Sequence, residues 1–242
     1  MDHRSVVRKE FERAASTFGD RTQGRFGHME VVAFSRVRSG TSVMDVGAGT
    51  GNFLALFGEQ AQALIAVDLT PAMLYEGRKR LDGLWAVVAD GALLPFAAAS
   101  IDLVTCAQML HHVEEPLEII KEMKRVAALR VLIVDQVATE DEAEIDAMNE
   151  LEKLRDPSHA LSRPPSAFRK LLSDAGLELI DERIVSSRDT LSKWMWPGEF
   201  PVDRIEAVHD FVEHRGNETG MEFEPSGNDY DFTRRRMMLL AR

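Results

Sequence analysis

The 242-residue sequence is poor in residues that define several protein classes. Cys106 is the single cysteine, so the sequence allows no internal disulfide and no thiolate metal cluster. No apolar run reaches the roughly 18 residues that a membrane-spanning helix needs, and the charged start at residues 1–4 does not lead into a signal peptide. We therefore expect a cytoplasmic protein with no membrane span and no bound metal.

Basic residues are also scarce. The chain has 29 Lys and Arg against 40 Asp and Glu, a formal net charge of -11. Nucleic-acid binding depends on neutralising phosphates with basic side chains, so we expect no nucleic-acid partner. Hydrophobic residues make up 45% of the sequence, which is enough for the core of one large domain.

The chain does contain a regular alternation of short apolar runs and helical patterns. The apolar runs predict strands at 43–46, 63–67, 84–89, 101–106 and 130–135. Helical periodicity predicts helices at 4–18 and 26–37 before the first strand, and at 52–60, from 71 and from 116 between the strands. This order is typical of an α/β protein with a doubly wound parallel sheet.

The pattern changes after residue 137. We expect an acidic helix at 140–155, another helix from 164, a strand at 177–186, a helix at 202–212 and a last, antiparallel strand at 232–240. The sequence thus predicts one domain over 1–242. Its parts are an N-terminal helical cap (1–40), a core (41–137), a helical insertion (138–176) and the end of the sheet (177–242).

The stretch VMDVGAGTGNF at 43–53 turns from a strand into a helix through three glycines. Such a turn brings bare backbone and free N–H groups to the carboxyl end of a strand, where open α/β sheets bind ligands. Asp68 and Asp90 end the next two predicted strands. A nicotinamide-binding turn would place a third glycine at position 52, which is Asn52, so that reading is disfavoured.

Four motifs together resemble class I S-adenosylmethionine-dependent methyltransferases, and within them the UbiE-like, quinone-methylating group (methyltransferase type 11). These motifs are DVGAGTG at 45–51, Asp68, DGALLPF at 90–96 and LHHVEEP at 110–116. The resemblance covers roughly residues 10–137. It implies a Rossmann-like sheet of seven strands, mostly parallel with the last antiparallel, and S-adenosylmethionine as cofactor. The glycine-rich turn that usually precedes the fifth strand is missing at 125–130.

The resemblance also implies roles for individual residues. Asp68 would accept the ribose hydroxyls, Asp90 would accept the adenine amino group, and Asp45 would order the glycine turn and contact the methionine amino group through water. Leu69 and Met73 would pack against adenine. The full set of expected cofactor-binding residues is Asp45, Gly47, Ala48, Gly49, Thr50, Asp68, Leu69, Met73, Asp90, Gly91, Ala92, Ala107 and Gln108, with Arg25 as a candidate for the cofactor carboxylate or an ordinary solvated arginine.

Candidates for contact with the second substrate each have a structural alternative. His111 and His112 are candidate catalytic bases, or structural residues at the entry to a helix. His159 is a candidate substrate contact or an exposed loop histidine. Trp194 and Trp196 form either an apolar wall for a flat substrate or ordinary packing.

These observations predict methyl transfer to a small apolar or aromatic molecule, at carbon or oxygen by analogy with the quinone-methylating relatives. Two alternatives stay open: a regulatory or partner subunit that binds the cofactor without turnover, and an RNA methyltransferase. We expect a monomer or a homodimer.

Overall fold

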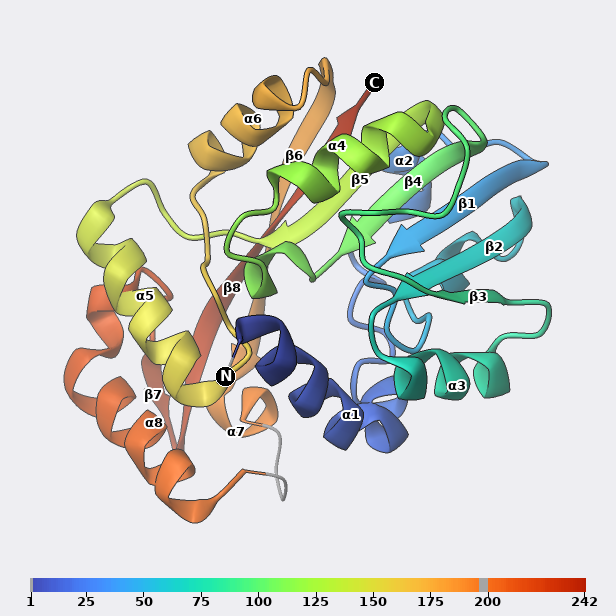
Figure 1. Ribbon diagram of the computed structural model, residues 1–242. Helices are drawn as coiled ribbons and strands as arrows, with labels where there is room; N and C mark the ends of the chain where they lie inside the picture. The colour runs from blue at the N-terminus through green and yellow to red at the C-terminus, as the bar shows by residue number, and fades with distance from the viewer. Residues whose placement is uncertain (1, 196–199) are drawn as a thin grey trace.

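The computed structural model describes residues 2–195 and 200–242 as one α/β fold built on a single sheet (Figure 1). The strands follow the order β3-β2-β1-β4-β5-β8-β6, and the short β7 pairs with β8 outside this path. Their bounds are β1 Thr41–Val46, β2 Ala61–Asp68, β3 Trp85–Val88, β4 Ile101–Ala107, β5 Ala127–Gln136, β6 Leu179–Thr190, β7 Glu224–Ser226 and β8 Asp229–Ala241. Strands β1 to β5 pair in parallel, and β8 pairs antiparallel with both β5 and β6. The predicted mostly parallel sheet with an antiparallel last strand is confirmed, and β7 is an eighth strand beyond the seven predicted.

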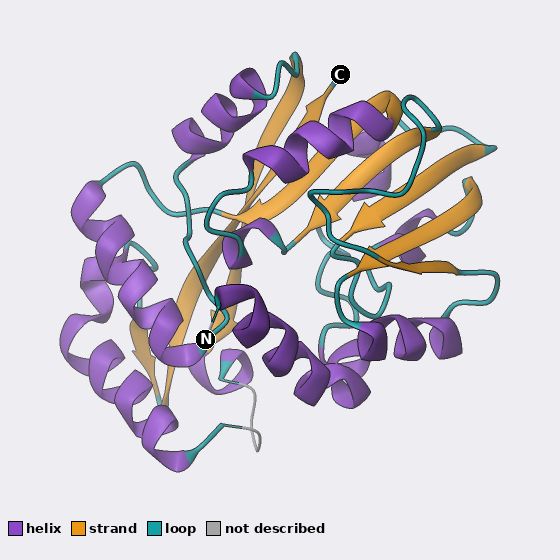
Figure 2. Ribbon diagram, in the orientation of Figure 1, coloured by secondary structure: helices purple, strands orange, loops and turns teal. Residues whose placement is uncertain are grey.

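Helices cover both faces of the sheet, as expected where parallel strands are joined by crossovers (Figure 2). The α-helices are α1 His3–Arg21, α2 Val31–Ser35, α3 Pro71–Arg80, α4 Leu117–Val126, α5 Glu142–Arg155, α6 Pro165–Asp174, α7 Leu191–Trp194 and α8 Val202–Arg215, and the 3-10 turns are η1 Leu54–Phe57, η2 Leu110–His112 and η3 Gly216–Thr219. One apolar cluster joins α4 and α6 to the sheet through Ile120, Met123 and Phe168. A second cluster joins α2 and η1 to the opposite face through Phe34 and Phe57.

The strands β6 and β8 continue beyond the end of β5 and carry a second lobe. There, α5, α7 and α8 share an apolar cluster with the outer half of β8, centred on Leu151, Trp194, Phe211 and Phe232. Figure 1 shows this lobe at the left, with α1 lying between it and α3. Helix α1 thus crosses the carboxyl edge of the parallel strands, between the two parts of the molecule.

Several sequence-based boundaries were wrong for local reasons. The helix predicted at 52–60 is only the 3-10 turn η1, and the helix predicted at 26–37 is reduced to α2 because Glu30 and Arg36 on either side take positive φ. Helix α4 passes directly into β5 at Ala127, so this connection has no separate turn. The short β7 was missed because its three exposed residues carry no apolar pattern.

None of the described helices combines the length and apolar character needed to cross a bilayer.

Candidate functional site

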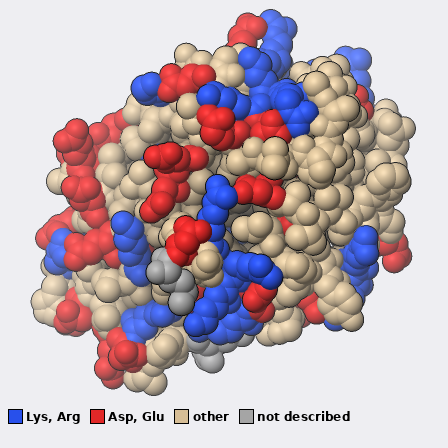
Figure 3. Space-filling view, viewed as in Figure 1, with Lys and Arg blue, Asp and Glu red and all other residues tan. Residues whose placement is uncertain are grey.

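A cavity of about 930 Å³ lies at the carboxyl edge of the parallel strands. The ends of β1, β2 and β4 form its floor, α1 and the following turns cover it, and the inner face of β8 closes the far side. In Figure 3 the middle of the visible face is hollowed, and both Lys or Arg and Asp or Glu side chains lie around the hollow. The predicted cofactor-binding residues and the predicted catalytic histidines line this one space, with Met73 and Ala92 as exceptions.

The glycine turn after β1 is ordered by the neighbouring strand β2. The N–H groups of Gly47 and Ala48 both donate to the carbonyl of Val67, at 2.8 and 3.0 Å. Gly47 has φ +72°, and a Cβ there would lie 2.3 Å from Cγ of Met109. Glycine is therefore required at this position both for its backbone angle and for its lack of a side chain.

Asp45 was expected to order the glycine turn, but its side chain bonds to a neighbouring strand instead. Its carboxylate is 1% exposed and accepts a hydrogen bond from the Thr105 hydroxyl on β4 at 2.7 Å. Burial raises the pKa of Asp45 to about 7, against the effect of the Thr105 hydrogen bond. The carbonyl of Val67 and the carboxylate of Asp68 bond to the turn, whereas Asp45 links β1 to β4.

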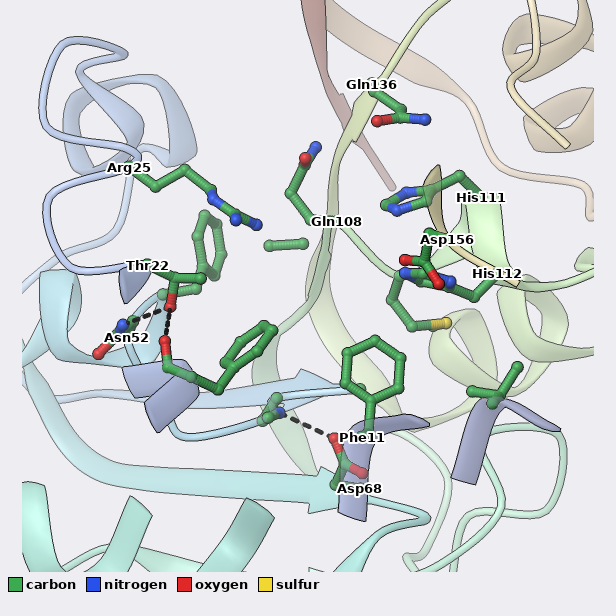
Figure 4. Close-up of a pocket in the computed structure, with 18 of the residues that line it drawn as sticks. Phe11, Thr22, Arg25, Asn52, Asp68, Gln108, His111, His112, Gln136 and Asp156 are labelled. Carbon is green, nitrogen blue, oxygen red and sulfur yellow. Dashed lines mark hydrogen bonds between the residues drawn. The ribbon is translucent and has the colours of Figure 1, made fainter. Parts of the chain in front are cut away.

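Asp68, at the end of β2, faces the glycine turn. Its Oδ2 accepts the Gly49 N–H at 2.8 Å, which is drawn in Figure 4, and its Oδ1 accepts the Thr70 N–H at 2.8 Å. Burial raises the pKa of Asp68, while these backbone donors oppose that effect. Each carboxylate oxygen can accept more than one hydrogen bond, so Asp68 keeps acceptor capacity toward the cavity.

Asp90 and Gly91 follow β3 at the other side of the cavity floor. One oxygen of Asp90 accepts the Ala92 N–H at 2.9 Å, and the other pairs with Arg4 of α1 at 2.6 Å. Leu69 lines the cavity beside Asp68 and is 39% exposed. Met73 is completely buried and, like Ala92, is not part of the cavity wall.

The end of β4 contributes Ala107 and Gln108. Gln108 takes φ +54°, a strained angle for a residue other than glycine, and its N–H donates to Val134 at 2.7 Å. Nε2 of its side chain is buried without a hydrogen-bond partner in the described structure, as is the Thr50 hydroxyl in the glycine turn. Both residues line the cavity.

His111 lies in η2 and forms a buried pair with Asp135 of β5. Its Nδ1 lies 2.6 Å from Oδ1 of Asp135, and its backbone N–H donates to Oδ2 at 3.2 Å. Burial lowers the pKa of His111 well below its usual value and raises the pKa of Asp135 to about 6. The carboxylate of Asp135 holds the imidazole ring through Nδ1, which leaves Nε2 as the other ring nitrogen. His111 borders the cavity (Figure 4). No motif in the sequence points to Asp135.

His112 also borders the cavity, but its contacts are structural. Nδ1 donates to the Ser158 carbonyl at 2.9 Å, and its ring packs edge-on against Phe11 of α1, with centroids 5.1 Å apart. The His112 carbonyl lies 3.0 Å from Nε2 of His3. His112 therefore joins η2 to the loop after α5 and to α1.

His159 was expected either to contact the substrate or to lie exposed in a loop, and it does neither. It is 2% exposed and lies outside the cavity wall. Its Nε2 lies 2.9 Å from Oδ1 of Asn149. The residue is thus a buried part of the connection between α5 and α6, and not an exposed loop histidine.

Trp194 is 5% exposed, lines the cavity and packs against Phe232, with ring centroids 5.0 Å apart. The guanidinium of Arg155 lies 4.6 Å from its ring centre. The other predicted tryptophan, Trp196, lies outside the described residues.

Helix α1 is fixed over the cavity by polar contacts at its two ends. Arg4 pairs with Asp90 at one end. At the other, the Asn52 amide donates to the Gly19 carbonyl at 2.7 Å and to the Thr22 hydroxyl at 2.8 Å (Figure 4). Asn52, which stands where a nicotinamide site would have its third glycine, therefore holds the cover of the cavity.

The remaining wall carries arginines that the sequence analysis did not single out. Arg234 and Arg236 project from β8, and Arg155 reaches the cavity from the end of α5. Arg25, which the sequence did suggest, approaches Gln108 from the turn after α1 (Figure 4). The sequence gives no local signal for this group, because its members are distant in the chain and meet only in the fold.

Comparisons with known proteins agree with this geometry. Residues 44–131 match the methyltransferase-domain family. An uncharacterized methyltransferase of Bacillus subtilis (strain 168), YcgJ, is 27% identical over 195 residues, which cover 78% of this chain and 77% of that protein. A demethylmenaquinone methyltransferase of Renibacterium salmoninarum is 36% identical over 87 residues, but the match spans only 36% of this chain and 37% of that enzyme.

Solved structures show the same fold over most of the chain. The crystal structure of YcgJ superposes with a TM-score of 0.80 at 25% identity, covering 88% of this chain and 95% of YcgJ. A Bacillus halodurans C-125 protein described as a methyltransferase candidate superposes with a TM-score of 0.82 at 23% identity, covering 88% of this chain and 97% of that protein. With the glycine turn, the strand-end carboxylates and the cavity above them, these matches show a methyltransferase domain at residues 44–131 and support S-adenosylmethionine as the methyl donor.

Proposed function

We propose that this methyltransferase acts on a small molecule with an apolar or aromatic body, and that it methylates carbon or oxygen. The supporting observation is the composition of the site: the cofactor motifs and a buried His–Asp pair border one cavity. Phe11, Phe18 and Trp194 supply aromatic surface in its wall. The demethylmenaquinone methyltransferase among the relatives supports a quinone-like or phenol-like methyl acceptor by analogy.

The residues present fit the cofactor. Asp68 would bind the ribose hydroxyls and Asp90 the adenine amino group, each beside backbone that a ligand can approach closely. The unpartnered Thr50 hydroxyl and Gln108 amide would bind polar groups of the methionine portion, and Arg25 its carboxylate. When bound, S-adenosylmethionine supplies an activated methyl group on a positively charged sulfur.

The protein's own contribution is to hold both reactants and to manage one proton. Enclosing them under α1 excludes water and fixes their orientation, an effect that can supply about 7–11 kcal/mol of the barrier reduction. His111 would take a proton from a phenol or an activated ring carbon at Nε2, while Asp135 holds the ring through Nδ1 and stabilises its charged form. This pair favours turnover over a subunit that only binds the cofactor.

The cofactor assignment is tested by calorimetric titration with S-adenosylmethionine. Asp68→Ala should weaken binding by about tenfold or more, because charged hydrogen bonds of this kind are worth about 1.5–3 kcal/mol each. Asp82→Ala removes the same charge from an exposed turn and should bind like the wild type. Unchanged affinity in Asp68→Ala would contradict the ribose contact.

Turnover is tested by incubating the protein with labelled S-adenosylmethionine and a panel of phenols, quinols and carboxylated aromatic compounds. We expect at least one of these compounds to be methylated, and we expect this methylation to depend on His111. Tight cofactor binding without product from any compound would favour the non-catalytic alternative.

A further inference from the structure

The cavity wall opposite the glycine turn carries a group of arginines, of which Arg155 and Arg236 are buried and Arg25 and Arg234 are partly buried. Arg234 and Arg236 point into the cavity from β8, because alternate residues of a strand share one face. Arg235 between them points the other way and pairs with Glu222. Arg25 and Arg155 reach the same space from other elements.

Most basic side chains in this wall have a carboxylate partner. Arg155 pairs with Glu152 at 2.8 Å, Arg234 with Asp189 at 3.3 Å and Arg188 with Glu224 at 2.8 Å; Lys193 also lies 3.5 Å from Asp189. Asp156 accepts from Ser158 at 2.5 Å and lies 3.9 Å from Arg155, and Asp135 is paired with His111. The nearby acidic groups are therefore already engaged.

Arg25 and Arg236 are the exceptions, since neither has a carboxylate within 4 Å among the residues described. Arg236 is only 4% exposed. Nη1 of Arg236 has a long contact of 3.4 Å with the Ser187 hydroxyl, and its buried Nε has no partner in the described part of the chain.

The pKa shifts of Arg25 and Arg236 show that nearby negative charges do not balance the positive charges of these two side chains. Burial, together with repulsion from Arg234 and Arg25, lowers the pKa of Arg236 to about 8, although Asp189 and Asp135 act in the opposite direction. Burial likewise lowers the pKa of Arg25 to about 9. A buried cation without a partner is unfavourable in the free protein and becomes favourable when an anion binds beside it.

The cofactor accounts for one of the two charges, because its carboxylate is assigned to Arg25 above. We propose that Arg236 binds a carboxylate on the methyl acceptor, so that the second substrate is a small aromatic or apolar carboxylic acid. This inference rests on the proposed function. A single uncompensated charge fits a monoanion, and hydrogen bonds between a guanidinium and a carboxylate are among the strong ones in proteins.

The position of Arg236 suits a compact substrate. Arg236 is the direct cross-strand partner of Gln136 on β5, and Asp135, which holds His111, is the preceding residue. The side chains of Asp135 and Arg236 leave opposite faces of the sheet, but Arg236, Gln136 and His111 all line the same cavity. An anion at Arg236 would therefore keep the rest of a small molecule in the space that the proposed base borders.

The test uses benzoate and its neutral analogue benzamide, titrated by calorimetry into the full chain saturated with S-adenosylhomocysteine. Saturation occupies the cofactor carboxylate position, so benzoate must find another cation. We expect benzoate to bind at least about tenfold more tightly than benzamide. Arg236→Met should lower benzoate affinity by about tenfold or more, while the charge-matched Arg235→Met on the same strand should change it less than about twofold.

Each other outcome is decisive. Equal affinity for benzoate and benzamide, or no benzoate binding by a wild type that binds S-adenosylhomocysteine, overturns the carboxylate site and leaves the proposed function intact. Tighter binding of phenyl phosphate than of benzoate overturns the assignment to a carboxylate. Failure of the wild type to bind S-adenosylhomocysteine overturns both proposals. The wild-type comparison decides the question even if Arg236→Met does not fold.

Discussion

At the scale of single residues, buried polar groups define the site. His111 and Asp135 share one hydrogen bond of 2.6 Å in a region with little solvent, where burial favours the uncharged form of each group. A histidine that is neutral near pH 7 and fixed by a carboxylate is suited to accept a proton.

We predict that His111 protonates well below pH 6.5, as burial lowers its pKa. The exposed His214 should protonate above pH 6.5, because the carbonyl and carboxylate of Asp210 raise its pKa. Imidazole signals followed by NMR over a pH series would show both midpoints, with His111→Gln providing the assignment. A midpoint for His111 at or above that of His214 would exclude the neutral base.

Gly47 allows a second prediction at this scale. Gly47→Ala would bring a Cβ within 2.3 Å of Met109, whereas Gly83→Ala, at a similar φ of +74°, meets nothing within 4 Å. Both variants carry similar backbone strain, so the difference between their losses of stability measures the cost of the contact with Met109. Gly47→Ala should lower the free energy of unfolding by about 1–3 kcal/mol more than Gly83→Ala. Equal losses in denaturant titrations would show that Met109 moves aside freely.

At the scale of elements, α1 is the cover of the cavity, and its contacts at both ends are polar. It is bound to residues of the floor, Asp90 and Asn52, more than to a large apolar surface, and only Ala15 and Gly19 of this helix are buried. An element held in this way can open with a small loss of free energy, which a cover over an enclosed cavity needs in order to admit ligands.

Asn52→Ala should loosen this cover. The substitution removes two hydrogen bonds, each worth about 0.5–1.5 kcal/mol, so amide exchange within α1 should become roughly 5 to 150 times faster. Arg8→Ala, which removes an ion pair within the helix to Glu12, is the control for helix fraying alone. Exchange that rises equally in both variants would show that Asn52 does not hold α1.

At the scale of the whole molecule, the parallel core and the β6–β8 lobe meet at the cavity. The connection between α5 and α6 joins them, and His159 is buried there against Asn149. Burial lowers the pKa of His159 to about 4, so the unfolded chain binds a proton near pH 6.5 that the folded chain does not yet accept.

The contribution of His159 to stability is therefore complete above pH 6.5 and is lost as the pH falls toward 4. Relative to His159→Gln, which keeps a donor for Asn149, the wild type should lose about 2–3 kcal/mol of unfolding free energy over this window. Denaturant titrations at several pH values would measure the difference. Parallel pH profiles for the two proteins would contradict the assignment.

The sequence by itself determined the parallel core and which residues lie at its carboxyl edge. Each of its signals is local: an apolar run makes a strand, and the residue after the strand must lie at the carboxyl edge. Asp45, Asp68 and Asp90 therefore converge in any parallel sheet of this order. The helical pattern at 52–60 predicted a full helix where only the 3-10 turn at 54–57 forms, and the three-residue β7 escaped prediction because its exposed residues carry no apolar pattern.

Only the tertiary structure decided the other half of the site. Asp135 meets His111 across 24 positions of sequence, and the unpaired charge of Arg236 becomes apparent only when the neighbouring carboxylates are seen to be engaged elsewhere. His159 likewise has a local sequence that suits an exposed loop, yet it is buried. Burial and pairing are properties of groups brought together by folding, and no stretch of the chain encodes them alone.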